Sequence, residues 1–352
     1  MRPKLTRIRG DEPLDCLVVG GGPAGLAAAI QLGRMRRSCA IVDDDAGRSL
    51  WSQITRNHLG FPDGVSATDL RLLGQRQAVR YGGELLGGRV TGLRRDRRRA
   101  GGFVATIEPR APATADDTTP GLPGNQRRER RYAARLGERA TPHSATLRAR
   151  TVIVATGVVD AFPSFSGRDE CVGVSLFWCI VCDGYEAIGR HVAVVGDDEE
   201  ALETALGLLH FTARVTLVTG RRRTPAPVKR LRQLEARDVV VHRTTVATYQ
   251  HEGGRMERLV LGDGTDVPCD MVFVSTPKRP QNELARRLGA TVDVDGHLVV
   301  DPDGRTTVAG VFAAGDVTAG HAHQVTAAAH GGATAATAVN HELYDTVERG
   351  DA

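Results

Sequence analysis

Aromatic residues are scarce in this sequence of 352 residues, where they make up only 4% of the chain. That scarcity argues against an aromatic-rich binding sandwich, whereas 41 glycines and many alanines favour tight turns and close packing of helices on strands. The hydrophobic fraction of 41% and the charged fraction of 25% exclude collagen-like, coiled-coil and mostly disordered chains. At about 150 residues per domain, the length predicts two domains or one large elaborated domain.

The sequence also lacks long hydrophobic runs and a strong excess of one charge. Residues 1–15 contain no apolar core of a signal peptide, and the run from Leu17 to Ile30 is short and interrupted by glycine. We therefore expect a cytoplasmic protein with no membrane span. The net charge of +4 provides no uniform field for nucleic acid, so nucleic-acid binding is not expected. Lysine occurs only at Lys4, Lys229 and Lys278, which we attribute to coding bias in the genome.

Six cysteines are too few for a scaffold stapled by disulfides, but Cys179 and Cys182 have the spacing Cys-x-x-Cys. Two thiols at this spacing can close a small disulfide, and the neighbouring carboxyl group of Asp183 can handle a proton. We therefore predict a redox pair, with a buried inert pair as the alternative. A metal site is not expected, because the other cysteines are single and His321, His323 and His330 have no clustered carboxylate or thiol.

A glycine-rich turn near the N-terminus carries the pattern of a dinucleotide-binding site. The segment Gly20-Gly-Gly22-Pro23-Ala24-Gly25 follows an apolar strand and opens an alanine-rich helix, and Asp43 closes the next strand. Glycines allow the backbone to approach a pyrophosphate at the helix N-terminus, and an acidic residue at this distance can accept hydrogen bonds from a ribose. We predict a site for FAD or NAD.

A second turn of the same kind is a poor copy of the first. It follows the strand His191–Val195 and keeps Gly196 and Ala201, but Asp198 stands at the second glycine position. Carboxylates here stabilise the N-terminus of the helix 201–211 and repel a pyrophosphate. In contrast, Arg221, Arg222 and Arg223 follow the strand 214–219, where an NADP 2′-phosphate is often bound. NADPH binding is therefore left open.

The remaining strands and one long insertion complete the order of elements. Strands are expected at 270–275 and 308–316, with a helix from about Gln324 to Asn340, so the chain returns to its first domain. Between Arg94 and Arg148 the apolar period is lost, apart from a strand around 103–107. We interpret this stretch as a disordered surface insertion, and an arm for nucleic acid or an acidic partner is the alternative.

Four motifs in this order resemble the low-molecular-weight thioredoxin reductases and related flavoprotein disulfide oxidoreductases. These motifs are Gly20 to Gly25, Ala155-Thr156-Gly157, Cys179-x-x-Cys182-Asp183-Gly184 and the run Gly310 to Gly315-Asp316. The resemblance implies an α/β fold of two doubly wound Rossmann-like FAD/NAD(P)-binding domains, the first split in sequence. Residues 1–162 and 286–352 would form the FAD-binding domain, with the insertion at about 109–146. Residues 163–285 would form the NAD(P)-type domain that carries the cysteine pair.

The resemblance also implies roles for single residues. Cys182 would face the flavin and form the thiolate–flavin contact, Cys179 would exchange with the substrate, and Asp183 would be the acid. Asp316 would bind the ribityl or pyrophosphate part of FAD. The helix that begins near Gln324 and Val325 would direct its positive end at the flavin and stabilise its reduced, anionic form.

Three departures from the family pattern leave the reaction partner open. The segment between the cysteines is Ile-Val, the usual Arg-Gln-Ala is His323-Gln324-Val325, and the second glycine turn is degraded. The resemblance implies a homodimer that contains FAD and exchanges electrons with a thioredoxin-like protein or a small-molecule disulfide or dithiol. NADPH is one possible donor. The alternatives are an oxygen-using dithiol oxidase that acts on a small natural product and a flavin-binding redox sensor without turnover.

Overall fold

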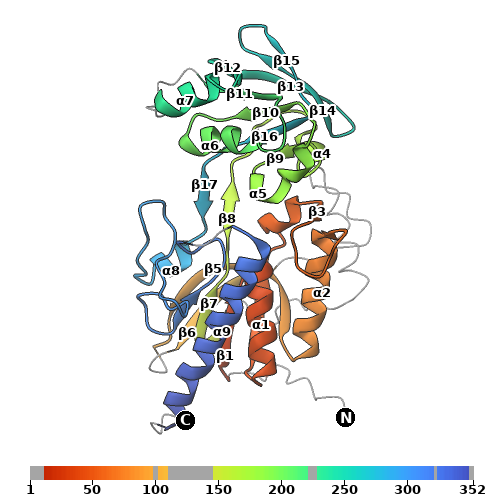
Figure 1. Cartoon of the computed structure of the whole chain (residues 1–352). Coiled ribbons are helices and arrows are strands. Elements are labelled where there is room, and N and C mark those ends of the chain that lie inside the picture. Colours follow the sequence, from red (N-terminus) through yellow and green to blue (C-terminus); the bar gives the residue numbers. More distant parts are fainter. Residues whose placement is uncertain (1–11, 98–101, 110–145, 221–227, 321–322, 349–352) are drawn as a thin grey trace.

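The computed structural model describes residues 12–97, 102–109, 146–220, 228–320 and 323–348. These residues form two lobes connected by two strands (Figure 1). The connecting strands are β8 (Val158–Asp160) and β17 (Lys278–Pro280), which pair with each other in antiparallel orientation. No helix in the described ranges is long and apolar enough to cross a membrane.

The lobe that contains both ends of the described chain is built on a six-stranded sheet. Its strands are β1 (Leu14–Val19), β2 (Cys39–Asp43), β5 (Glu84–Arg95), β6 (Phe103–Pro109), β7 (Thr146–Val154) and β18 (Val311–Ala313). The long strand β5 pairs with β2 in parallel orientation, and the long strand β7 pairs with β1 in the same way. At its other end, each of the two pairs with β6 in antiparallel orientation. β1, β2 and β18 are buried almost throughout because helices or loops cover both faces of the parallel part.

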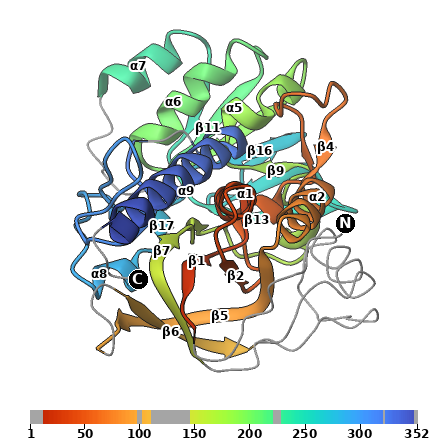
Figure 2. The same cartoon turned by 90° about the horizontal axis from the view of Figure 1, so that it is seen from below.

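Helices cover one face of this first sheet. They are α1 (Pro23–Arg34), α2 (Ala67–Arg80) and α9 (Val325–Glu348), and α1 lies beside both of the others (Figure 2). Small residues bring α1 and α9 close together: a Cβ on Gly332 would collide with the backbone carbonyl of Ala24. The opposite face packs against the short helix α8 (Glu283–Arg286), through Leu284 and Ala285.

The second lobe contains a five-stranded parallel sheet in the order β12-β11-β10-β16-β9. The strands are β9 (Leu176–Phe177), β10 (Val192–Val195), β11 (Val215–Val218), β12 (Val240–His242) and β16 (Met271–Val274). One face is covered by α6 (Glu199–Leu208) and α7 (Val228–Glu235), and the other by an antiparallel sheet. That antiparallel sheet contains β13 (Val246–Glu252), β14 (Arg255–Leu261) and β15 (Asp266–Pro268).

Short elements complete the fold around the junction of the lobes. They are the 3-10 helices η1 (Arg48–Trp51) and η2 (Tyr185–Ala187), the strands β3 (Ile54–Thr55) and β4 (Val65–Ser66), and the helices α4 (Arg168–Cys171) and α5 (Ile180–Asp183).

The predicted α/β class with two Rossmann-like domains is confirmed, as are the strands and helices expected around both glycine turns. The expected strand at 103–107 is β6. Residues 110–145 of the predicted insertion lie outside the described ranges, and residues 109 and 146 are the ends of β6 and β7. The predicted domain boundaries and the disorder of the insertion stay predictions.

Candidate functional site

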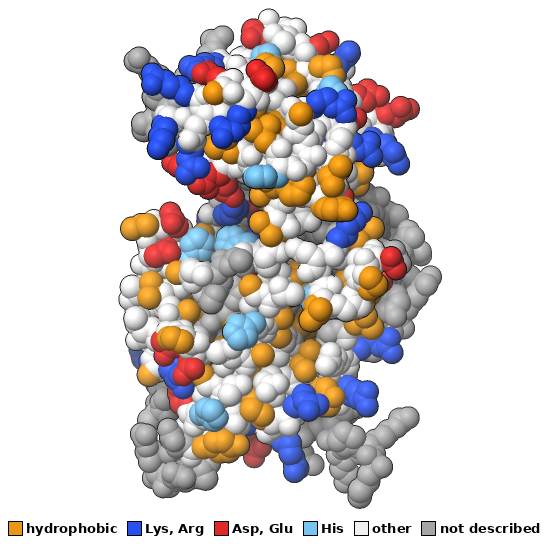
Figure 3. Space-filling model, viewed as in Figure 1, with side chains coloured by type: hydrophobic (Ala, Val, Ile, Leu, Met, Phe, Trp, Pro, Cys, Tyr) orange, Lys and Arg blue, Asp and Glu red, His pale blue; other side chains and the backbone are white. Residues whose placement is uncertain are grey.

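A cavity of about 630 Å³ lies at the junction of the lobes. Its volume falls within the range of roughly 300–1,000 Å³ that is usual for small-molecule and cofactor sites. The molecule narrows to a waist at this junction, and histidine side chains gather there on the visible face (Figure 3). Most of the predicted site residues line this cavity: Gly20, Gly22, Pro23, Ala24, Asp43, Ala155, Thr156, Gly157, Cys179, Cys182, Asp183, Gly315, Asp316, Gln324 and Val325.

The first glycine turn forms a cradle in the cavity wall. Gly20 has φ +105°, a conformation that favours glycine, and a Cβ on Gly25 would collide with the carbonyl oxygen of Gly20. Gly25 itself is therefore needed for packing beneath the turn. Gly22 is the N-cap of α1, and a Cβ there would meet no protein atom within 4 Å. The open space at Gly22 and the helix N-terminus beside it fit an approaching pyrophosphate.

Asp43 closes β2 beneath this cradle. Its carboxylate accepts a hydrogen bond from the backbone N–H of Gly21 at 3.0 Å and pairs with the buried guanidinium of Arg71 on α2. Arg71 also pairs with Asp45 at 3.1 Å. No local sequence pattern points to Arg71, because it lies on α2, 28 residues after Asp43.

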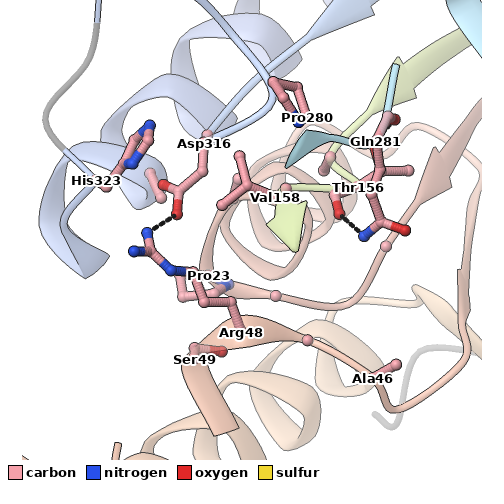
Figure 4. A pocket seen from close by; sticks show the side chains of 18 of the residues that line it. Pro23, Ala46, Arg48, Ser49, Thr156, Val158, Pro280, Gln281, Asp316 and His323 are labelled. Atoms are coloured by element: carbon pink, nitrogen blue, oxygen red, sulfur yellow. Dashed lines mark hydrogen bonds and ion pairs between the residues drawn. The ribbon is translucent and has the colours of Figure 1, made fainter. Parts of the chain in front are cut away.

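Two further loops complete the cavity wall (Figure 4). Thr156 donates from Oγ1 to the carbonyl oxygen of Gln281 at 2.6 Å, and Gln281 donates from Nε2 to the carbonyl oxygen of Thr156 at 2.7 Å. Asp316 pairs with Arg48 at 3.1 Å, and Arg48 also pairs with Asp160 at 2.6 Å. Arg48 and Gln281 also line the cavity, and no local motif in the sequence marks either of them.

The cysteine pair forms the disulfide that its spacing predicts. Cys179 and Cys182 are bonded, with their Cα atoms 5.3 Å apart, and both line the cavity. The backbone N–H of Cys182 donates to the sulfur of Cys179 at 3.2 Å.

The other four cysteines are free and buried. They are Cys16, Cys39, Cys171 and Cys269, and burial raises the thiol pKa of each, to about 11 for Cys171. A high pKa disfavours the reactive thiolate, so the disulfide pair is chemically distinct from these four.

Asp183 directly follows this pair, and its environment changes its acidity. Burial raises the pKa of its carboxyl group to about 7, the negative charge of Glu186 adds to that rise, and Arg56 opposes it. A carboxyl group with a pKa near 7 can both accept and donate a proton at neutral pH. Asp183 is therefore suited to general acid–base catalysis beside the disulfide.

The start of α9 reaches the disulfide from the first lobe. Nε2 of Gln324 lies 3.2 Å from the sulfur of Cys182 and 3.5 Å from the sulfur of Cys179. His323, next to it, also lines the cavity, and burial holds its pKa below the ordinary value. Gln324 was expected to bind the cofactor, and its amide is directed at the two sulfur atoms.

The chain matches the family model described as pyridine nucleotide-disulphide oxidoreductase over residues 14–332. It belongs to this family. It is 28% identical to the bifunctional thioredoxin reductase/thioredoxin of Mycobacterium leprae, over 92% of this chain and 64% of that protein. It is 28% identical to the thioredoxin reductase of Streptomyces coelicolor, over 91% of each chain. The crystal structure of HlmI superposes with a TM-score of 0.79 at 28% identity, covering 97% of this chain and 96% of that one.

These matches confirm a thioredoxin reductase-like flavoprotein disulfide oxidoreductase, with FAD as its cofactor. The observed cradle agrees with that cofactor, because Gly22 leaves open space at a helix N-terminus while Gly20 and Gly25 bring β1 and α1 close together. The match covers 64% of the length of the M. leprae relative, so about a third of that protein has no counterpart in this chain.

In the second glycine turn of this disulphide oxidoreductase, the carboxylates of Asp197 and Asp198 accept hydrogen bonds from neighbouring groups of the protein. Asp198 caps α6 by accepting from the backbone N–H of Ala201 at 2.9 Å, and Ser275 donates to Asp198 at 2.7 Å. Asp197 accepts from Thr219 at 3.1 Å and from the backbone N–H of Gly220. The expectation that a carboxylate at this turn stabilises the N-terminus of the helix agrees with Asp198, which is the N-cap of α6.

Gly196, at the start of this turn, is not among the described residues that line the cavity. A Cβ on Gly196 would lie 2.8 Å from the Cβ of Ala201, so Gly196 is needed for close packing of β10 on α6. Arg221, Arg222 and Arg223 lie outside the described ranges, as does His321. NADPH binding by this chain stays a prediction.

Proposed function

We propose that this protein is a FAD-dependent dithiol–disulfide oxidoreductase that exchanges electrons with its substrate through Cys179 and Cys182. The observation that carries the proposal is the position of this disulfide: it lies on the wall of the same cavity as the glycine cradle. Asp183, with its pKa near 7, supplies a proton acceptor and donor beside it. A redox sensor without turnover would not need that acid–base group.

The cavity residues divide into those that would hold FAD and those that would react. We assign Gly20, Gly22, Pro23, Ala24, Asp43, Ala155, Thr156, Gly157, Gly315, Asp316 and Val325 to FAD binding, together with Gly25, which packs beneath the glycine turn. When bound, FAD supplies the two-electron acceptor or donor for the thiol pair. The start of α9 borders the cavity, so its positive end favours negative charge there.

Thiol–disulfide exchange is the step that the residues of this chain carry. In the oxidative direction, one thiolate of a substrate dithiol attacks the sulfur of Cys179, the Cys179–Cys182 bond breaks, and Cys182 leaves as a thiolate with the electron pair. Asp183 removes the proton of the second substrate thiol, which attacks its partner sulfur in the mixed disulfide. The product disulfide departs and Cys179 takes the proton from Asp183. In the reductive direction each step runs backward.

The second glycine turn favours the oxidative direction. The carboxylate of Asp197 accepts a hydrogen bond from the backbone N–H of Gly220, and that of Asp198 accepts one from the backbone N–H of Ala201. A dinucleotide pyrophosphate would have to displace them against like-charge repulsion of roughly 4 kcal/mol per pair of charges 4 Å apart at an effective dielectric of 20. We therefore propose a dithiol oxidase that uses oxygen, acts on a small-molecule dithiol and releases hydrogen peroxide.

An NADPH-dependent disulfide reductase is the second candidate. It is favoured by the relative from S. coelicolor, whose name is thioredoxin reductase and which matches over nearly its whole length. In that case NADPH, bound with the help of Gly196, Arg221 and Arg222, would be the donor and a thioredoxin-like protein would be the acceptor. For both candidates we propose a cytoplasmic homodimer.

Two measurements on the purified yellow protein separate the candidates. Oxygen consumption and peroxide release on addition of a small dithiol, together with no flavin reduction by NADPH without oxygen, would support the oxidase. Rapid stoichiometric reduction by micromolar NADPH would support the reductase. Full activity of both Cys179→Ser and Cys182→Ser in either assay would contradict catalysis by this pair.

A further inference from the structure

The side chain of Gln324 connects the two lobes at the wall of the cavity. Gln324 lies immediately before α9 in the first lobe, and Nε2 of its amide contacts the sulfurs of Cys182 at 3.2 Å and Cys179 at 3.5 Å in the second lobe. The residues are 142 and 145 positions apart in sequence. The contact with Cys182 is the shorter of the two.

Asn57 determines which end of this amide faces the sulfurs. Nδ2 of Asn57, in the loop after β3, donates to Oε1 of Gln324 at 2.8 Å. A glutamine amide has an acceptor oxygen at one end and donor N–H groups at the other. Because the oxygen is engaged by Asn57, the N–H groups are directed at the disulfide.

This donor interacts differently with the two redox states of the pair. A disulfide sulfur is neutral and a weak acceptor, whereas a thiolate is charged, and charge-assisted hydrogen bonds are roughly twice as strong as neutral ones. A hydrogen bond to the charged form also lowers the pKa of the group that accepts it. The amide of Gln324 therefore gains interaction energy when the bond between the cysteines opens and Cys182 carries the charge.

We propose that Gln324 is a catalytic hydrogen-bond donor that stabilises the Cys182 thiolate, and that Asn57 is the positioning residue that orients it. This proposal deepens the proposed dithiol chemistry and rests on it. It assigns to Gln324 a role toward the thiol pair in place of the expected role toward the cofactor.

Several charged or titratable groups line the same cavity as Cys182 or act on Asp183 next to it, and their effects must be separated from the effect of Gln324. Asp183 and Glu186 follow Cys182 in the chain, Arg56 precedes Asn57, and His323 precedes Gln324. Arg56 pairs with Glu186 at 3.2 Å. Gln324 does not titrate, so its removal is expected to shift the whole thiol titration without adding or removing another step.

The experiment measures the pKa of the Cys182 thiol in the FAD-loaded Cys179→Ser protein, where Cys182 is the only thiol of the pair. Two readouts are used across pH: the long-wavelength thiolate–flavin absorption and the rate of alkylation of Cys182 by iodoacetamide, quantified by peptide mass spectrometry. The alkylation readout also works on protein that has lost FAD. The variants are Gln324→Met, which keeps the length of the side chain without donors, and Asn57→Ala. Gln77→Met, at an exposed position of α2, is the matched control.

We expect Gln324→Met to raise the thiol pKa by about one unit, which is a tenfold smaller thiolate fraction at a pH below the pKa. Asn57→Ala should raise it in the same direction by a smaller amount, and Gln77→Met should leave it unchanged. An unchanged pKa in Gln324→Met would overturn the proposal, and an unchanged pKa in Asn57→Ala alone would overturn the positioning role.

The proposed function has a separate test. A protein with normal thiol titrations but no turnover of dithiols or disulfides would contradict the proposed function, and the shift caused by Gln324→Met would still show hydrogen bonding to the thiolate. Turnover with no shift would contradict only the role of Gln324.

Discussion

Gly22 and Gly25 in the cradle differ in the contacts that an added side chain would make. A Cβ on Gly25 would strike the backbone of Gly20, whereas a Cβ on Gly22 would point into open space. The backbone of Gly22 has φ −75° and ψ −175°, which any residue can adopt. Gly22 is thus a position where cofactor binding can be changed without changing the fold.

We predict that Gly22→Ala folds normally but binds FAD at least tenfold more weakly, because its methyl group occupies the space that the pyrophosphate must approach. Thermal unfolding of the protein without FAD should be unchanged, and titration with FAD followed by flavin fluorescence gives the affinity. Unchanged affinity would remove this turn from the FAD site.

The negative charge of ionised Asp183 lowers the free energy of unfolding, because the carboxylate is buried. Its pKa is raised from 3.8 to about 7 by burial, so the folded state resists ionisation more than the unfolded state does. Below pH 4 the group is protonated in both states and costs nothing. As the pH rises from about 4 to about 7 the cost grows, and above pH 7 it stays constant.

We predict that Asp183→Asn is more stable than the native protein by ~1–3 kcal/mol above pH 7 and equally stable near pH 4. Its turnover should fall by about 10²- to 10⁴-fold, because the proton acceptor beside the disulfide is lost. Urea unfolding at the two pH values and the pH profile of turnover measure both effects. A profile that keeps a step near pH 7 in the variant would assign that step to another group.

At the scale of an element, the N-terminus of α6 shows how one helix can be stabilised at the expense of a ligand site. Asp198 caps this helix, and Asp197 engages the end of the neighbouring strand β11 through Thr219 and Gly220. Glycine at an N-cap costs only about a few tenths of a kcal/mol relative to aspartate. The capping carboxylate of Asp198 can therefore be removed with little loss of stability.

We predict that the double change Asp197→Gly and Asp198→Gly speeds flavin reduction by NADPH at least tenfold, since it frees N–H groups and removes two negative charges. Anaerobic stopped-flow spectroscopy measures the rate. The control is Glu252→Gln with Glu257→Gln, which removes the same net charge from exposed positions of the same lobe. Equal rates in the native, altered and control proteins would show that these carboxylates do not limit NADPH binding.

At the scale of the whole molecule, each lobe is assembled from segments that are far apart in sequence. The first sheet joins β1 to β7 and β18, and the cavity combines loops of this sheet with the cysteine segment of the other lobe. Residues 110–145 interrupt this lobe between β6 and β7, which pair in antiparallel register with Thr106 opposite Thr146. The two ends of the interruption are therefore held close together by the sheet.

We predict that a short glycine-containing turn can replace residues 110–145 without loss of the fold, the FAD content or turnover. Shortening the loop about ninefold lowers its closure entropy cost by about 2 kcal/mol, so stability should be equal or slightly higher. Thermal unfolding and the ratio of flavin to protein absorbance measure the outcome. A protein that no longer folds or binds FAD would assign a structural role to the excised residues.

The sequence alone was sufficient wherever the signal is local. A strand, a glycine turn and a helix follow one another within about 20 residues, so the backbone geometry at Gly20 to Gly25 can be predicted from spacing. The same holds for the disulfide, because Cys179 and Cys182 are three residues apart, and for Asp198, which caps the helix that it precedes. The resemblance to disulfide oxidoreductases rested on such local motifs and is confirmed.

Tertiary structure alone decided the contacts between side chains that no local pattern connects. Arg71 on α2 meets Asp43 at the end of β2, Arg48 joins Asp160 to Asp316, and Gln324 reaches the disulfide across the two lobes. Hydrophobic periodicity fixes which face of an element is buried, but it does not fix which polar side chains two packed elements bring together. The pKa of Asp183 is likewise raised by burial, and that burial exists only in the folded protein.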